Sequence, residues 1–219
     1  MSKENKDTLA AYQKTANIYL SNSLRHDKIN PIRAENKFNS LKKFLKSNLM
    51  QLKKDAKIFE IGSGSGSNAK YIESLGYKVT ASDVADGFID EIKSKNLNTI
   101  KFNVLEDEFP EKYSAILAWR VFVHFTPEDI YEVLKKSYEA LEKDGIIIFN
   151  VINKEVRKVS DEWVDFDGEY HMGIKRYYHY YTKSELDYII SKTNFKIKSF
   201  LKEGGENNDK WLVYVLQKK

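Results

Sequence analysis

Short apolar runs alternate with amphipathic segments through the middle of the chain. Five of these runs have the length of buried strands. They are Lys57–Ile61, Lys78–Ser82, Thr99–Asn103, Ser114–Ala118 and Gly145–Val151. Helices are expected to begin near Ser67 and Ala85, and a third at Thr126-Pro127, because threonine caps helices and proline suits the first turn. This alternation predicts a parallel sheet that is covered by helices on both faces.

Helices and strands are also predicted on both sides of this region. The two helices before the first strand are expected at Lys6–Leu20 and Ala34–Leu52. After the fifth strand, Asn153–Tyr181 is rich in Tyr, His, Asp and Lys and is expected to be irregular. A helix at Lys183–Thr193 follows. The last two strands, Phe195–Lys202 and Lys210–Gln217, are joined by a turn-rich segment and predict an antiparallel hairpin.

The stretch IFEIGSGSGSNAKYI joins the first strand to the next helix and contains Gly62, Gly64 and Gly66. Glycine lets the backbone turn tightly and lets a ligand lie against bare main chain, with helix N–H groups pointing at it. The dinucleotide motif G-x-G-x-x-G would need a glycine where the chain has Ser67. No Lys-Ser or Lys-Thr pair follows, which excludes the phosphate loop of nucleotide hydrolases. The loop predicts a cofactor cradle, with a flexible Gly/Ser turn as the alternative.

Polar residues lie at the ends of the predicted strands, where open parallel sheets bind their ligands. Glu60 ends the first strand, and Asp83 ends the second one, 17 residues after the last glycine of the loop. An acid in this range usually accepts two ribose hydroxyls, and a surface turn or helix cap is the alternative. Asn103 ends the third strand and can bond an adenine edge or cap a turn. Trp119 and Arg120 lie just past the fourth strand, at the mouth of the expected site.

Composition narrows the classes of protein. A chain of 219 residues with 42% hydrophobic residues is expected to form one domain. The absence of cysteine excludes disulfides and thiolate metal sites, and no metal site is expected. The first residues lack an apolar signal core, and no apolar run approaches the about 20 residues that cross a bilayer, so a cytoplasmic location is expected. The net charge of +4 comes from lysines interleaved with acids, which indicates a solvated surface and no nucleic-acid partner.

Four motifs follow one another along the chain: EIGSGSG at 60–66, TASD ending at Asp83, YSAILAWRVFVHF at 113–125 and LEKDGIIIF at 141–149. In this order and spacing they resemble the class I S-adenosylmethionine-dependent methyltransferases over most of the chain. Within that superfamily, the chain is similar to small bacterial enzymes of the tellurite-resistance and natural-product type. The features shared with these enzymes are the N-terminal Tyr12, Ala16 and Tyr19, the segment Lys175–Thr182 and the strand residues Lys210-Trp211-Leu212.

The resemblance implies a role for the glycine loop and its neighbouring acids. Gly62, Gly64 and Gly66 would pass under the methionine and ribose parts of S-adenosylmethionine, with Glu60 near the amino end of that cofactor. Asp83 would hold the ribose hydroxyls.

The resemblance also implies which residues surround the rest of the cofactor. Asn103, together with the backbone of Val104, would meet the adenine, although the family often has Asp in this region. Tyr12 and Tyr19 lie seven positions apart on one helical face and would close over the cofactor, with core packing as the alternative. Trp119 would also lie at the cofactor.

Methyl transfer from a sulfonium is an in-line displacement, so the enzyme mainly needs to align the acceptor with the methyl group. A base is needed only if the acceptor must lose a proton, and His124, His171 and His179 are the candidates for catalysis. The structural alternatives are core packing for His124 and surface positions for the other two histidines.

Arginines at the site indicate a charged acceptor. Arg120 at the rim of a sulfonium site would need a compensating anion, such as a carboxylate or phosphate on the acceptor. The alternative is a salt bridge to an acid such as Glu35 or Asp161. Arg176 and Tyr178, from the segment expected to cap the cleft, are further candidates for binding the substrate.

We therefore expect an α/β domain with a Rossmann-like, seven-stranded, mostly parallel sheet, helices on both faces and a C-terminal antiparallel hairpin. Residues 1–53 would form a helical lid, 54–152 the cofactor-binding core, 153–181 an acceptor-capping insert and 182–219 the last helix and hairpin. The expected reaction transfers a methyl group from S-adenosylmethionine, with S-adenosylhomocysteine as product. The acceptor would be an O or N atom of a small polar metabolite, an anionic one if Arg120 faces it.

Three other functions remain as alternatives. An RNA or protein methyltransferase is one, although the N-P-P-Y motif that grips a planar base amine is absent after the fourth strand. A module that binds S-adenosylmethionine without catalysis is the second. A nicotinamide-dependent reductase is the third and is disfavoured by Ser67.

Overall fold

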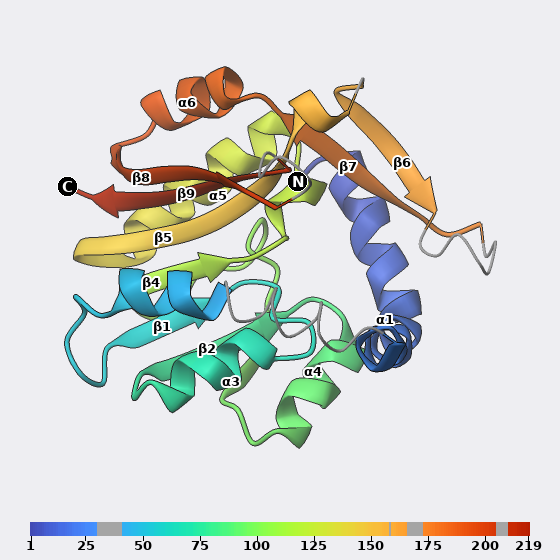
Figure 1. Ribbon diagram of the computed structural model, residues 1–219, viewed down its shortest axis with the longest axis horizontal. Helices are drawn as coiled ribbons and strands as arrows, with labels where there is room; N and C mark the ends of the chain where they lie inside the picture. The colour runs from blue at the N-terminus through green and yellow to red at the C-terminus, as the bar shows by residue number, and fades with distance from the viewer. Residues whose placement is uncertain (30–40, 158, 166–172, 205–209) are drawn as a thin grey trace.

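The five predicted central strands form a parallel sheet in the computed structural model, which describes residues 1–29, 41–157, 159–165, 173–204 and 210–219 (Figure 1). The strands are β1 (Lys57–Glu60), β2 (Lys78–Asp83), β3 (Thr99–Lys101), β4 (Tyr113–Ala118) and β5 (Leu141–Asn153). Their order in the sheet is β3-β2-β1-β4-β5. The strand order therefore reverses between β1 and β4, which opens a crevice at the carboxyl ends of these strands.

The helices between these strands begin within a residue of the predicted positions. They are α3 (Ser67–Ser74), α4 (Asp86–Ser94) and α5 (Pro127–Ala140), and a short 3-10 helix, η1 (Phe122–His124), precedes α5. The Thr126 hydroxyl accepts a hydrogen bond from the Asp129 N–H (3.2 Å), which confirms the predicted cap of α5.

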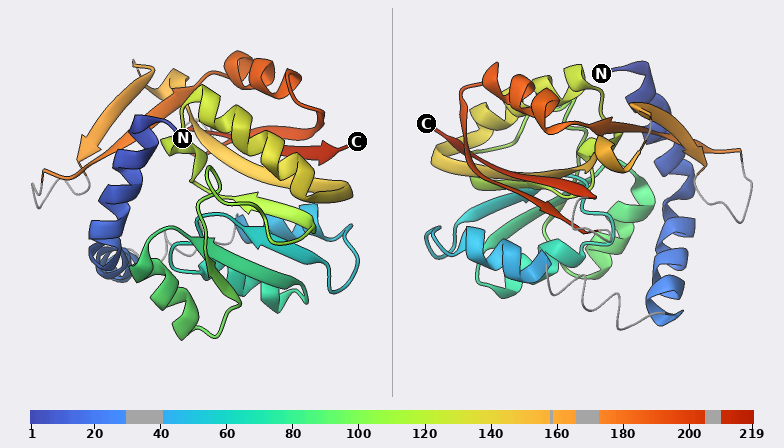
Figure 2. Two further views of the ribbon diagram at one scale, coloured as in Figure 1. Left: turned by 180° about the vertical axis from the view of Figure 1, so that it is seen from behind. Right: turned by 45° about the horizontal axis from the view of Figure 1, so that its top comes forward.

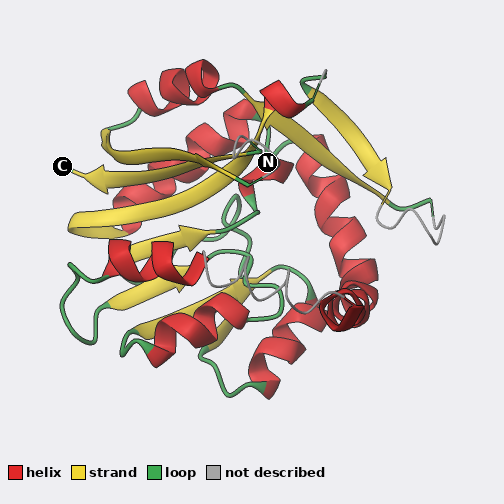
Figure 3. Cartoon of the chain, in the orientation of Figure 1, coloured by secondary structure: helices red, strands yellow, loops and turns green. Residues whose placement is uncertain are grey.

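The C-terminal hairpin is also confirmed. Helix α6 (Lys183–Ser191) leads into β8 (Phe195–Glu203) and β9 (Trp211–Lys218). Strand β9 pairs antiparallel with both β5 and β8, so the hairpin continues the sheet beyond β5. The seven predicted strands thus belong to one mostly parallel sheet, with helices on both sides of it (Figure 3).

The segment Asn153–Tyr181 was predicted to be irregular, and this prediction is wrong, because the segment contains two paired strands. After the short helix η2 (Lys154–Val156), β6 (Asp161–Asp165) and β7 (Lys175–Tyr181) pair antiparallel, and β7 also pairs parallel with the end of β5. Tyr177, Tyr180 and Tyr181 of β7 are buried, and the neighbours Tyr180 and Tyr181 belong to different apolar clusters, so this end of β7 is covered on both faces. Residues 166–172 lie outside the described part of the chain.

Helix α1 (Lys3–Ile29) is longer than the predicted helix at Lys6–Leu20. It packs against β7, α4 and η1, and Figures 1 and 2 show it beside the carboxyl ends of the central strands. Residues 41–49 form a helix within the predicted Ala34–Leu52, and residues 30–40 lie outside the described chain. In the described ranges, we find no helix whose length and apolar character would allow it to cross a membrane.

Strands β1, β2 and β4 of the sheet are mostly buried on both faces, whereas the edge strand β3 is not. Neighbouring residues on a strand point to opposite sides of a sheet. In β4, Ile116 therefore packs in the core under α5 and α6. Its neighbour Leu117 packs on the other side, in the core that includes Leu45 and Ile72. Two cores thus fix the sheet from both sides and hold the carboxyl ends of its strands in place.

Candidate active site

A cavity of about 750 Å³ lies at the carboxyl ends of β1, β2 and β4. The glycine loop, the end of β2 and η1 contribute to its lining, and α1 lies across from them. Ten of the residues predicted for the site line this cavity: Tyr12, Tyr19, Gly62, Gly64, Asp83, Asn103, Val104, Trp119, Arg120 and His124. The crevice that the strand order opens is therefore the place where most predicted site residues meet.

The glycine loop presents bare main chain to the cavity. At Gly62 (φ 64°), an added Cβ would lie 2.5 Å from a methyl carbon of Val121, so no side chain fits there. At Gly64 (φ 53°), an added Cβ would meet no atom within 4 Å, and this glycine lines the cavity. A side chain at Gly64 would therefore occupy open space in front of the loop. Gly66 is the N-cap of α3.

Asp83 ties the glycine loop to the start of α4. Its buried carboxylate accepts hydrogen bonds from the N–H groups of Gly64 (3.0 Å), Val84 (2.8 Å) and Ala85 (3.2 Å). Burial raises the pKa of this carboxyl, and the three N–H groups oppose that shift. A carboxylate has about four lone-pair sites, so Asp83 keeps the capacity to accept a further hydrogen bond from the cavity that it lines.

Glu60 carries a buried carboxyl group, and only one of its two oxygens accepts a hydrogen bond. One oxygen, Oε1, accepts a hydrogen bond from the Asn68 amide (3.1 Å), while Oε2 has no hydrogen-bond partner. Burial raises the pKa of Glu60 from 4.5 to about 7, and the bond from Asn68 opposes the shift. Glu60 is not among the described residues that line the cavity, but Asn68 is. The site therefore contains a carboxyl whose charge is poorly compensated by the protein.

Asn103 uses its side chain within its own turn. The amide oxygen accepts from the N–H of Leu105 (3.2 Å), and the amide nitrogen lies 3.2 Å from the Glu106 carboxylate and 3.5 Å from Met1 Sδ. Of the two predicted roles for this side chain, the structure shows the turn. Asn103 and the buried Val104 both line the cavity.

Aromatic residues from three segments form part of the cavity wall. The rings of Tyr12 and Tyr19 lie 6.5 Å apart, and both pack against Phe88 of α4 (6.2 and 5.6 Å). Trp119 is buried and packs against Phe44 at 6.2 Å. The two tyrosines thus line the cavity and pack against α4 at the same time.

His124 is a neutral hydrogen-bond acceptor in the cavity wall. Its Nδ1 lies 2.7 Å from the carbonyl oxygen of Tyr177, which can only accept, so Nδ1 carries a proton. Burial lowers the pKa of His124 to about 3, so Nε2 is unprotonated at neutral pH. The Tyr12 hydroxyl lies 2.8 Å from Nε2 and therefore donates to it. Because the Tyr177 carbonyl can only accept, it fixes the donor and the acceptor in both hydrogen bonds of His124.

Arg176 and Tyr178 support this pair from outside the cavity. Arg176 Nη1 donates to the Tyr12 hydroxyl oxygen (3.1 Å), and its guanidinium lies over the rings of Tyr12 (5.4 Å) and Tyr178 (5.6 Å). The Tyr178 ring packs edge-on against His124 at 4.5 Å. Neither Arg176 nor Tyr178 is among the described residues that line the cavity. Both therefore reach the site through Tyr12 and His124.

Arg120 has an unusual backbone for a residue with a long side chain. Its φ of 63° lies in the left-handed region, and its N–H donates to the side-chain oxygen of the buried Asn150 (2.7 Å). The guanidinium lies over the ring of Trp211 (5.1 Å), and the residues Arg120 and Glu203 both line the cavity. The surrounding protein partly strips water from Arg120 and lowers its pKa, which the charge of Glu203 opposes.

The salt bridge considered for Arg120 is not formed within the described chain. No carboxylate of the described residues, Asp161 included, lies within ion-pair distance of the guanidinium. Glu35 lies outside the described residues. Arg120 is thus an exposed residue of the cavity lining whose guanidinium has no ion-pair partner among the described residues.

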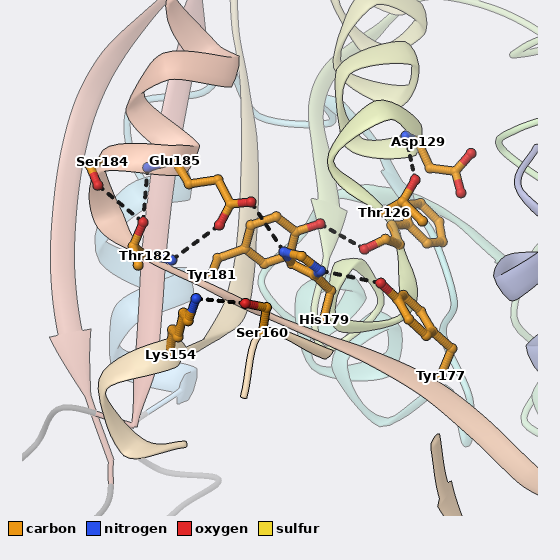
Figure 4. Close-up of polar contacts among 11 residues, drawn as sticks. Thr126, Asp129, Lys154, Ser160, Tyr177, His179, Tyr181, Thr182, Ser184 and Glu185 are labelled. Carbon is orange, nitrogen blue, oxygen red and sulfur yellow. Dashed lines mark hydrogen bonds and ion pairs between the residues drawn. The ribbon is translucent and has the colours of Figure 1, made fainter. Parts of the chain in front are cut away.

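His179 belongs to a separate cluster between β7 and α6 (Figure 4). Its Nδ1 lies 3.2 Å from the Tyr177 hydroxyl, and its Nε2 lies 3.2 Å from the Glu185 carboxylate. Glu185 also completes the capping box of α6 with Thr182, whose hydroxyl accepts from the Glu185 N–H (3.1 Å). His179 is not among the described residues that line the cavity. His171 lies outside the described residues.

Sequence reasoning missed several residues of α1 and the hairpin that line the cavity. They are Asn5, Thr8, Leu9 and Glu203. The spacing of seven that relates Tyr12 to Tyr19 reaches back to Asn5, so the helical period could have extended the predicted face to the first turn of α1. The position of Glu203 depends on the hairpin and left no local signal.

Comparisons with known proteins agree with this geometry. A family profile described as "Methyltransferase domain" matches residues 33–199. The ubiquinone biosynthesis O-methyltransferase of Rickettsia bellii is 26% identical over 231 residues, which cover 97% of this chain and 91% of that protein. The probable S-adenosyl-L-methionine-dependent methyltransferase TehB of Haemophilus influenzae is 29% identical over 89 residues, which cover 38% of this chain and 31% of that protein.

A solved structure shares the fold over the full chain. The chain in the DhpI–SAH complex superposes with a TM-score of 0.71 at 14% identity and covers 99% of this chain and 98% of its own length. At this level of identity, the likeness concerns the fold. The profile and the longer sequence match support the resemblance that the motifs predict.

Proposed function

Because this chain belongs to the class I S-adenosylmethionine-dependent methyltransferases, we propose that it methylates an ionised oxygen of a small anionic molecule. The observation that carries this proposal is Arg120, which lines the cavity and whose guanidinium has no ion-pair partner among the described residues. The printed name of the Rickettsia bellii relative, an O-methyltransferase, supports oxygen as the acceptor atom. In this proposal, residues 1–53 act as a lid over the cavity.

The residues at one end of the cavity fit the cofactor. The space in front of Gly64 would accept the methionine and ribose parts, with the main chain of the loop beneath them. Asp83 has lone pairs left for ribose hydroxyls, and Glu60 has an unpartnered oxygen that would favour the cationic amino end. When bound, the cofactor supplies a methyl group on a positively charged sulfur.

The hydrogen bonds of His124 argue against removal of a proton from the acceptor. An imidazole whose pKa is held near 3 by burial cannot keep a proton taken from a hydroxyl at neutral pH. Its Nε2 is also occupied by the Tyr12 hydroxyl. An acceptor that is already ionised needs no base: its oxygen lone pair forms the new C–O bond as the C–S bond breaks. Arg120 would stabilise the charge of such an acceptor in the cavity.

The pair of His124 and Tyr12 is therefore a positioning device in this proposal. The chain of donation runs from Arg176 to the Tyr12 oxygen and from the Tyr12 hydroxyl to His124. It fixes the Tyr12 ring at the cavity wall, where it would help to align the acceptor with the methyl group. His179, which bonds Tyr177 and Glu185, is not given a part in the reaction.

The proposal is tested with small carboxylic acids and acidic phenols as acceptors, beside their neutral amide and methoxy analogues. Mass spectrometry should detect the gain of one methylene on ionised acceptors only. Arg120→Ala should raise the KM of the best acceptor about 10-fold or more while leaving the Kd of S-adenosylhomocysteine unchanged. Arg157→Ala is the matched control, because Arg157 lies over Tyr180 (5.5 Å) and does not line the cavity among the described residues.

Two results would contradict the proposal. Neutral analogues that are methylated as well as their anionic counterparts would remove the need for a charged acceptor. An Arg120→Ala variant that loses cofactor affinity and keeps its acceptor KM would assign Arg120 to the cofactor.

A further inference from the structure

Asn5 is a buried amide that makes no hydrogen bond with its side chain. The residue is 1% exposed, and neither its side-chain oxygen nor its side-chain nitrogen has a partner. It lies in the first turns of α1 and lines the cavity. Buried amides in proteins are nearly always hydrogen-bonded, because leaving one unpaired costs folding free energy. The unpaired amide of Asn5 therefore points to a ligand that completes it.

Contacts of the first residues place Asn5 near the loop that follows β3. Met1 Sδ lies 3.5 Å from the Asn103 amide nitrogen in that loop. The Ser2 hydroxyl donates to the Asp129 carboxylate at the start of α5 (2.5 Å) and accepts from the Asn5 N–H (3.1 Å). The first turn of α1 is thus fixed between the loop after β3 and the start of α5.

The loop after β3 is where the adenine of the cofactor is expected, yet the Asn103 side chain is already bonded there. Its oxygen accepts from the Leu105 N–H, and its nitrogen lies within hydrogen-bond distance of the Glu106 carboxylate. A second amide at this end of the cavity, that of Asn5, has both groups available. From the sequence, the amide of Asn103 is expected to meet the adenine. In the structure, Asn5 on α1 has the unpaired amide that could take this role.

We infer that Asn5 binds the amino edge of the adenine ring of the cofactor. A carboxamide presents an acceptor and a donor side by side, and adenine presents its 6-amino donor beside a ring-nitrogen acceptor. Two hydrogen bonds therefore form at once, and both atoms of the Asn5 amide are satisfied. This inference rests on the proposed function, since it needs the cofactor in this cavity. Helix α1 then recognises the adenine base in addition to lining the cavity.

The inference is tested by calorimetric titration with two ligands: S-adenosylhomocysteine and its analogue with hydrogen in place of the 6-amino group. Wild-type protein should bind the analogue about 10-fold more weakly, because the Asn5 oxygen is left unpaired. Asn5→Leu should weaken S-adenosylhomocysteine about 10-fold and should bind both ligands equally. Asn17→Leu, an exposed asparagine on the same helix, is the matched control and should keep the wild-type preference.

Thermal unfolding without ligand gives a second readout. Replacing the unpaired amide of Asn5 by an apolar side chain should raise the Tm by a few degrees, while the affinity falls. If Asn5→Leu does not fold, Asn5→Ala replaces it, because alanine keeps the helix and also removes the amide.

The outcomes separate this inference from the proposed function. Variants at Asn5 that keep the wild-type preference for the 6-amino ligand would overturn the inference, while the cofactor site itself would stand. Wild-type protein that binds neither ligand would overturn the placement of the cofactor in this cavity. A Tm that falls in Asn5→Leu with unchanged affinity would make Asn5 a structural residue and would also overturn the inference.

Discussion

The cluster around His179 and the cavity beside His124 differ in how the polar side chains of each are hydrogen-bonded. His179, between β7 and α6, bonds Tyr177 and Glu185, and Glu185 in turn caps α6. At the cavity, both nitrogens of His124 are bonded as well, but the side-chain amide of Asn5, which lines the cavity, has no partner, and neither has Oε2 of Glu60 at the end of β1. A cluster whose hydrogen bonds are complete holds secondary structure together, whereas an incomplete one leaves groups for a ligand. Residue type alone therefore does not separate scaffold from site: both histidines are fully bonded, and the difference lies in the side chains around them.

Glu60 and the His179 cluster should contribute to stability with opposite dependence on pH, and the contribution of Glu60 is the larger. The folded-state pKa of Glu60 is raised from 4.5 to about 7, so the folded protein binds an extra proton between these values. Stability of the ligand-free protein should therefore fall by about 3 kcal/mol as pH rises through this range. The pKa of Glu185 is lowered, so its contribution is present above the unfolded-state pKa and is lost as pH falls.

Urea unfolding at a series of pH values measures this difference. Glu60→Gln should flatten the fall in stability between about pH 4.5 and pH 7, since glutamine cannot ionise. The exposed Glu139, which has no ion-pair partner among the described residues, is replaced by glutamine as the control and should leave the curve unchanged. A curve for Glu60→Gln that matches the wild type would show that the Glu60 carboxyl is compensated by the protein.

The next effect concerns ligand affinity at the cavity. Asp83→Ala should weaken binding of S-adenosylhomocysteine by about 1–3 kcal/mol, because the ligand hydroxyls and the loop N–H groups lose their acceptor. Calorimetry measures the Kd, and circular dichroism checks that the variant is folded. Asp161→Ala, an exposed aspartate on β6, should bind like the wild type. Equal affinity for the wild type and a folded Asp83→Ala would remove Asp83 from the cofactor site.

The smallest effect tests the scaffold around His179. Glu185→Ala should lower stability by about 1 kcal/mol, because it removes the N3 side chain of the capping box and the partner of His179. The Kd of S-adenosylhomocysteine should stay as in the wild type. Glu185→Gln keeps the capping box but loses the charge, so its stability should lie between those of the wild type and of Glu185→Ala. A change in Kd without a change in stability would place this cluster within the site.

The sequence predicted the parts of the fold that local patterns determine. The five parallel strands, the N-cap at Thr126 and the C-terminal hairpin follow from apolar runs and turn residues. Gly64 and Asp83 were found because loop and strand end lie close together in the chain and the spacing is typical of the chemistry. The pair β6 and β7 was missed, because alternation is weak in a run such as KRYYHYY and the pairing with β5 is not local.

The partners of individual side chains could not be predicted in the same way. Asn103 and Asn5 are both asparagines near one end of the cavity, and only the tertiary contacts show that the first is bonded in its turn and the second is not. The stretch MSKENKDT is polar and reads as a solvated beginning of a helix. Its burial at Asn5 arises from contacts of α1 with η1 and β7, which lie more than a hundred residues away.

Helix α1, which lines the cavity, is attached to two separate parts of the molecule. The Thr8 hydroxyl accepts from the Tyr177 N–H of β7 (2.9 Å), and the Gln13 amide donates to Asp86 at the start of α4 (2.8 Å). Detachment of this helix would uncover the cavity and break both attachments in a single opening event. A ligand bound in the cavity should therefore slow the exchange of the α1 backbone amide protons with deuterated solvent. The exchange rate of this helix would then measure how much of the protein has its cavity occupied.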